Sequence, residues 1–175
     1  RGINAIALFT IEEKGLLPSI ISLGAIPLPY IPYGICLGRT QDGETSVFVT
    51  TKEGVVAHWL LNSKNKDIKG RHLRSWKLSG KTESCKVDSA ENQLYVSEEA
   101  RGLWKLDLSE QNRVPTLVDE VAPRGHLVAD VEGVAIYRGL NSKSYLVVSS
   151  QGDNSFHIYN LSNQEWLGAI KISKS

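Results

Sequence analysis

The sequence has little of several features that would restrict its class. Its 175 residues include no methionine, 2 cysteines and 7% aromatic residues, and the formal net charge is +1. No apolar run approaches the roughly 20 residues of a membrane span, and a nearly neutral chain has no polyanion-binding tail. We therefore expect neither a membrane nor nucleic acid as a partner. Cys36 and Cys85 match no metal or redox spacing, and we expect two buried thiols.

The chain also lacks a recognisable beginning. It opens on Arg1 in the middle of a strand-like pattern, with no leader sequence ahead of it. We expect a piece of a longer protein. The missing leader consequently says nothing about the compartment in which the protein works.

What the chain does have is an internal repeat. Three stretches align, starting at Tyr33, Glu83 and Glu132, which are 50 and 49 residues apart. Each stretch has a short apolar strand, a turn, a β-rich strand, a second turn and a strand with an aromatic residue. A fourth strand follows each stretch. Four strands at a period of roughly 40–50 residues are typical of a β-propeller blade.

The predicted fold class is therefore an all-β propeller of four-stranded antiparallel blades. The segments are 1–31, the last strands of a preceding blade, and three blades at 32–79, 80–124 and 125–175. This makes about three and a half blades, fewer than the four to eight that usually close a propeller. We expect the remaining blades of the parent chain to be the nearest partner.

The repeat register selects polar residues at one end of the predicted blades. The strand-one starts carry Tyr33, Glu83 and Glu132, and the positions three residues after the valines of strand two carry Lys52, Glu99 and Gln151. In an up-and-down blade these two places lie at the same end. The predicted ring, which also includes Asp130 and Glu53, is rich in oxygen atoms and has no histidine or cysteine, and this favours calcium over zinc or copper.

These residues could also be ordinary surface residues without a functional role. Acidic residues at blade ends are often solvated turn residues, and Lys52 and Glu53 also fit an ordinary exposed turn. Asp130 and Glu132 are different, because on a regular strand they would share one face about 7 Å apart. Their repulsion would be relieved by a divalent cation between them.

Three long stretches and two short ones resemble the β-propeller phytases along essentially the whole chain. The matching segments are "PYG", "KEG", "TESCKVDSAENQLYVSEEARGLWKLD", "HLVADVEGVAIYRG" and "YLVVSSQGDNSFHIY". The resemblance implies a middle portion of a propeller of about six blades. One departure is Ser84, which stands where the family usually has glycine.

The resemblance also implies roles for individual residues. It implies several calcium ions as cofactors and a phytate-like inositol phosphate as substrate, hydrolysed by a metal-activated water. The implied sets are catalytic Glu83, Glu99 and Asp130, metal-ligating Asp130, Glu132, Gln151 and Glu83, and substrate-binding Tyr33, Lys52, Glu53 and Arg1.

Two functions of different class remain at the level of sequence. The first is a secreted or periplasmic phytase, a phosphoric monoester hydrolase, of which this segment alone would not hold a complete site. The second is a non-catalytic propeller segment that binds calcium and phosphorylated ligands, or an inactive fragment of the enzyme. The retained carboxylates Glu83, Glu99, Asp130 and Glu132 favour the enzyme.

Overall fold

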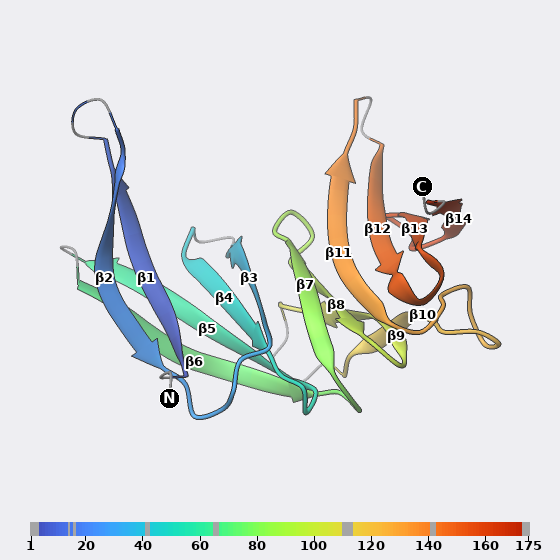
Figure 1. The fold of residues 1–175 in the computed structure, drawn as a ribbon, viewed down its shortest axis with the longest axis horizontal. Coiled ribbons are helices and arrows are strands. Elements are labelled where there is room, and N and C mark those ends of the chain that lie inside the picture. The colour runs from blue at the N-terminus through green and yellow to red at the C-terminus, as the bar shows by residue number, and fades with distance from the viewer. Residues whose placement is uncertain are drawn as a thin grey trace.

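The computed structural model describes residues 4–13, 15, 17–40, 43–64, 67–109, 114–140 and 143–172, and these form β-strands joined by turns (Figure 1). The strands are β1 (Ala5–Glu12), β2 (Ser19–Pro27), β3 (Gly34–Arg39), β4 (Thr45–Thr50), β5 (Val55–Lys64), β6 (Asp67–Lys77), β7 (Thr82–Asp88), β8 (Gln93–Glu98), β9 (Gly102–Asp107), β10 (Thr116–Glu120), β11 (Val131–Arg138), β12 (Ser144–Ser150), β13 (Ser155–Asn160) and β14 (Trp166–Lys171). Within the described residues the one helical segment is the 3-10 turn η1 (Gln151–Asp153). No helix of this part of the chain has the length and apolar character of a membrane span.

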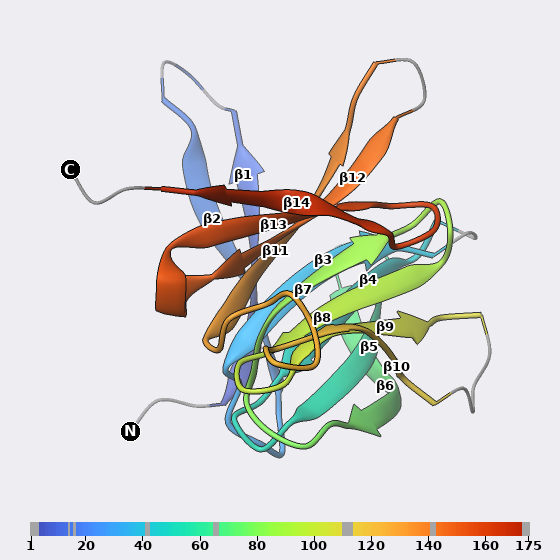
Figure 2. The ribbon, with the colours of Figure 1, turned by 90° about the vertical axis from the view of Figure 1, so that its right-hand side faces the viewer.

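Each sheet is antiparallel and its strands are ordered as in the chain. The four-stranded sheets are β3–β6, β7–β10 and β11–β14, and β1 pairs with β2 in a separate hairpin. Figure 1 shows the sheets arranged one after another, and in Figure 2, viewed from the side of the last sheet, β14 crosses in front of β1 and β2. This confirms the predicted all-β class with four-stranded antiparallel blades. The division into segments at residues 31, 79 and 124 stays a prediction.

The first strands of the three complete sheets lie side by side. β7 contacts both β3 and β11, and Figure 1 shows these three strands as neighbours. Adjacent first strands bring the starts of the three sheets close together. Residues that precede or begin these strands are thereby gathered at one end of the molecule.

Strand β8 shows how the apolar pattern builds two cores at once. Leu94 and Val96 point to one face of the sheet, where they pack in a cluster with Phe48 and Trp76 of the preceding sheet. Tyr95 points to the other face and joins a cluster with Leu146 of the following sheet. Because side chains alternate along a strand, a buried middle strand contributes apolar side chains to the clusters on both faces of its sheet.

The expectation of two buried thiols is wrong, because Cys36 and Cys85 form a disulfide. The two Cα atoms are 5.7 Å apart, and the residues are 49 positions apart in the chain. Cys36 lies on β3 and Cys85 on β7, the adjacent first strands of two sheets. A separation equal to one repeat places the two cysteines at neighbouring positions of successive blades, and this signal was available in the spacing.

Candidate functional site

The predicted polar residues lie at one end of the three complete sheets. The pairs Gly34–Thr50, Thr82–Glu98 and Val131–Ser150 face each other, so each sheet starts its first strand beside the end of its second. Lys52 and Glu53 occupy the exposed turn after β4, while Glu99 and Gln151 directly follow β8 and β12. The structure thus brings the predicted positions to a common end, except Arg1, which lies outside the described residues.

Tyr33 and Glu99 connect two of the sheets. The Tyr33 hydroxyl donates to Glu99 Oε1 at 3.1 Å, and the Nζ atom of Lys52 lies 4.8 Å from the centre of the Tyr33 ring. The hydrogen bond to Glu99, followed by burial and the charge of Glu83, raises the pKa of Tyr33 to about 12. The phenol therefore stays protonated near neutral pH and serves as a hydrogen-bond donor.

The pKa of Glu132 is affected by the other carboxylates of the site. Its pKa is raised, first by burial and then by the negative charges of Glu83, Asp130 and Glu99. Like charges that disfavour each other's ionised form must lie near one another. The structure therefore gathers these four acidic residues, contributed by two different sheets, into one negatively charged region.

The site also contains nitrogen donors that touch the acidic residues. Gln151 Nε2 donates to Glu132 Oε2, and Lys81 Nζ lies 3.2 Å from Glu99 Oε2. Among the described residues, no three His, Cys, Asp or Glu side chains stand close enough to hold a metal ion as they are placed. The acidic side chains share a region, and the Gln151 amide N–H group occupies the space beside Glu132.

Asp130 reaches the site by a different route from the one that the sequence suggested. It precedes β11 rather than belonging to it, and its φ of 71° is left-handed. Its N–H group donates to Glu99 O at 2.9 Å, and its carbonyl accepts from Gln151 N at 2.9 Å. The strand geometry assumed for Asp130 and Glu132 is therefore wrong, since a turn locked between two sheets orients Asp130. β11 also has an irregularity between Val131 and Val134.

Two serines that the sequence analysis did not assign to the site, Ser97 and Ser84, hold the backbone at the start of β11. The buried Ser97 hydroxyl contacts the carbonyls of Glu132 and, at 3.2 Å, of Ser84, and it accepts from Ser84 N at 3.2 Å. Ser84 Oγ in turn accepts from Val134 N at 3.2 Å. Ser84 thus links β7 to β11. A sequence pattern does not reveal these contacts, because they join neighbouring sheets.

The adjacent acids Glu98 and Glu99 have separate tasks. Glu98 is buried and accepts hydrogen bonds from Trp104 Nε1 at 2.7 Å and from Ser79 Oγ. Its carboxylate is thus paired inside the sheet. Glu99, one position on, instead accepts the hydrogen bond from Tyr33, and the repeat register assigns both residues to the ring without predicting this contact.

Comparison with known proteins gives the family. The sequence model described as Phytase matches residues 1–175. A protein named 3-phytase from Bacillus subtilis (strain 168) is 33% identical over 164 residues, which are 91% of this chain and 43% of the relative. The chain thus spans less than half the length of that relative. The match confirms the predicted resemblance, and the chain belongs to the Phytase family.

Proposed function

We propose that the protein containing this chain hydrolyses phosphate monoesters of phytate in a calcium-dependent reaction. The observation that carries the proposal is the gathering of Glu83, Glu99, Asp130 and Glu132 at one end of the sheets, beside Lys52 and Tyr33. Family membership and the relative named 3-phytase support phytate as the substrate.

The acidic region fits calcium on chemical grounds. Carboxylate oxygens are the ligands that calcium prefers, and it accepts irregular arrangements of them. Burial, and after it the surrounding negative charges, raise the pKa of Glu132 and so disfavour its ionised form, and a bound cation would offset this penalty. Glu83, Asp130 and Glu132 would hold calcium, with Gln151 contributing its carbonyl oxygen after the amide turns.

The chain's own residues have distinct tasks in the proposed reaction. Bound calcium would supply positive charge that neutralises phosphate oxygens and favours deprotonation of an attacking water. Tyr33 keeps its proton and donates its O–H to a phosphate oxygen in place of Glu99. Lys52 contributes a point charge from an exposed turn, as a lysine does when it binds phosphate. Glu53, from the same turn, would line the substrate site.

The disulfide supports a secreted or periplasmic location. Disulfides persist mainly in oxidising compartments, and Cys36–Cys85 joins two first strands within the fold. Extracellular fluids are also where a protein has a steady supply of calcium. A parent protein isolated from the cytoplasm with both thiols reduced would contradict this location.

The test is phosphate release from phytate by the full-length protein. We expect release to stop with a chelator, to return with added calcium, and to be lost in Glu83→Ala. The matched control is Glu44→Ala, an exposed glutamate before β4 at the other end of the sheet, which we expect to stay active. Calcium binding without any phosphate release would instead support the non-catalytic alternative and overturn the enzyme proposal.

A further inference from the structure

A second polar region lies between two complete sheets, at the end remote from the acidic residues. It is a cavity of about 650 Å³ bounded by the last part of β7 and β11, the first part of β8 and β12, and the turn before β14. Ligand sites commonly have volumes of roughly 300–1,000 Å³. Both bordering sheets have their four strands, so the cavity does not depend on blades outside the chain.

The wall of the cavity contains a buried acid with an unused oxygen. The Asp88 side chain is 0% exposed, and its Oδ1 atom pairs with Arg138 and accepts from Ala90 N at 3.1 Å. Asp88 Oδ2 is also buried and has no hydrogen-bond partner among the described residues. A buried acceptor left unpaired is costly. This oxygen is closed off from the open cavity, and a turn of the Asp88 side chain would let it accept a hydrogen bond from a donor there.

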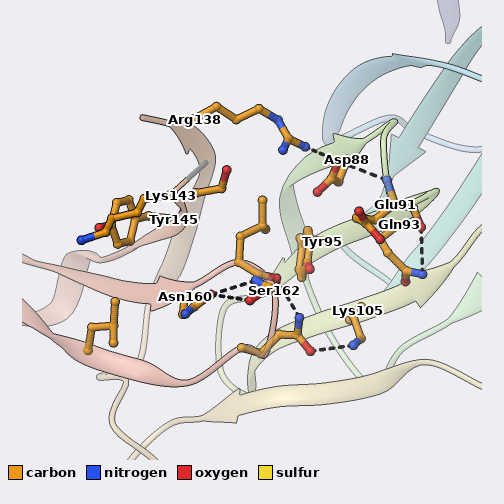
Figure 3. A pocket seen from close by; sticks show the side chains of 14 residues that line it. Asp88, Glu91, Gln93, Tyr95, Lys105, Arg138, Lys143, Tyr145, Asn160 and Ser162 are labelled. Carbon is orange, nitrogen blue, oxygen red and sulfur yellow. Dashed lines mark hydrogen bonds and ion pairs between the residues drawn. The ribbon is translucent and has the colours of Figure 1, made fainter. Parts of the chain in front are cut away.

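Other groups along the wall are fixed and polar (Figure 3). Lys105 Nζ donates to Gln164 Oε1 at 2.7 Å, and Ser162 Oγ donates to Asn160 Oδ1 at 2.8 Å. Burial and the charge of Asp88 raise the pKa of Tyr95 to about 12, so its hydroxyl is neutral. The wall thus offers amides, hydroxyls and paired charges in place of a large apolar surface.

We propose that this cavity binds a small uncharged polyhydroxylated molecule, a sugar or a polyol. A hydroxyl both donates and accepts, so one could donate to Asp88 Oδ2 while a neighbour accepts from the Arg138 guanidinium, whose side chain is 50% exposed. The wall carries charges of both signs, the acids Asp88 and Glu91 with the bases Lys105, Arg138 and Lys143, so it does not select a polyanion, and its polar groups disfavour an apolar ligand. This site is separate from the proposed phytate site and goes beyond it.

The test is a nuclear magnetic resonance titration of the isotopically labelled full-length protein, with maltose and myo-inositol as probes. A chelator keeps calcium away from the acidic residues, so the result does not depend on phytate hydrolysis. We expect saturable shifts of the side-chain amide signals of Asn160 and Gln164. We expect no such shifts with inorganic phosphate.

Variants assign the binding to this cavity. Ser144→Tyr at the start of β12 fills the space and should weaken probe binding at least tenfold. Thr45→Tyr at the start of β4 is the matched control and should leave binding unchanged. Asp88→Asn replaces the acceptor with a donor and should also weaken binding. If Asp88→Asn fails to fold, comparing probe binding by Ser144→Tyr and Thr45→Tyr still tests whether the probe occupies this cavity.

Three results would overturn the proposal. The first is no saturable shift with either probe, which would mean that water alone fills the cavity. The second is a response to phosphate and not to the polyols. The third is an equal loss of binding in the Ser144 and Thr45 variants. None of these results bears on phosphate release in the presence of calcium.

Discussion

The two junctions between complete sheets are built differently. The junction of β3–β6 with β7–β10 has a disulfide, Cys36–Cys85, and a cluster of apolar side chains around Phe48 and Trp76. The junction of β7–β10 with β11–β14 also has an apolar cluster, but it adds the Asp88–Arg138 ion pair and the hydrogen bond from Tyr159 to Asp119 at 2.6 Å. Hydrogen bonds cross both junctions, Tyr33 to Glu99 at the first among them, but within the described residues only the first junction is also closed by a covalent bond. We name the first the rigid junction and the second, with its buried ion pair, the polar junction.

The two junctions contribute to different properties of the protein: the first mainly to stability, the second mainly to the placement of polar groups. At the first junction Gly34 lets β3 approach β7 so closely that a methyl group would overlap the Glu83 carbonyl oxygen. At the second junction the Ser97 hydroxyl contacts the Glu132 carbonyl, and the cavity opens at the far end. The rigid junction fixes the backbone of Glu83, whereas the polar junction positions Glu132 and leaves space for a ligand.

The largest effect should come from opening the disulfide. Reduction, or the double change Cys36→Ser with Cys85→Ser, should lower the free energy of unfolding by about 2–4 kcal/mol, because the unfolded chain regains freedom. Denaturant unfolding with and without reductant measures this. The double variant serves as its own control, since reductant should not affect it. Equal stability of the oxidised and fully reduced wild type would remove the distinction between the junctions.

A smaller loss should follow Gly34→Ala. The added methyl group meets the Glu83 carbonyl and forces β3 away from β7. Overpacking of this kind costs about 1–3 kcal/mol. Phosphate release should fall as well, since Glu83 moves. Lys86→Ala, on an exposed position of β7, is the control and should stay within about 0.5 kcal/mol of wild type. A wild-type melting temperature in Gly34→Ala would refute the close approach.

Ser97→Ala tests the polar junction. It leaves the Glu132 carbonyl and the Ser84 N–H group short of a partner, at a cost of about 1–2 kcal/mol. Because the backbone of Glu132 is then less well held, calcium affinity measured by calorimetry should fall. The fall should exceed the one expected from the fraction of protein that the lower stability leaves unfolded. Ser89→Ala, on an exposed turn after β7, is the control. Unchanged calcium affinity in Ser97→Ala would show that the serine acts on folding only.

The strands of each sheet could be predicted from the sequence, whereas the contacts between sheets could not. The repeat predicted the strands and the common end of Tyr33, Glu83 and Glu99, because hydrophobic alternation and turns are local signals. It failed for Cys36–Cys85, where the spacing of one repeat was read as unrelated thiols. It also failed for Asp130, since the left-handed turn depends on Glu99 and Gln151 from neighbouring segments. Contacts across sheets have no local pattern.

The smallest effect should come from acid acting on His58, in the sheet of the rigid junction. Burial, with the nearby charges of Arg74, His72 and Arg71, lowers its pKa from 6.5 to about 4. Between these two pH values His58 is protonated more readily in the unfolded chain than in the folded one. The contribution of neutral His58 to the free energy of unfolding is therefore fully present above pH 6.5 and is lost as the pH drops toward 4. From pH 6.5 to 5.5 the loss should be about 1 kcal/mol, because one group changes the free energy by at most about 1.4 kcal/mol per pH unit. Denaturant unfolding of wild type and His58→Phe at both pH values measures it: the variant should lose this part of the slope, whereas Lys86→Ala, at an exposed position of β7, should retain it.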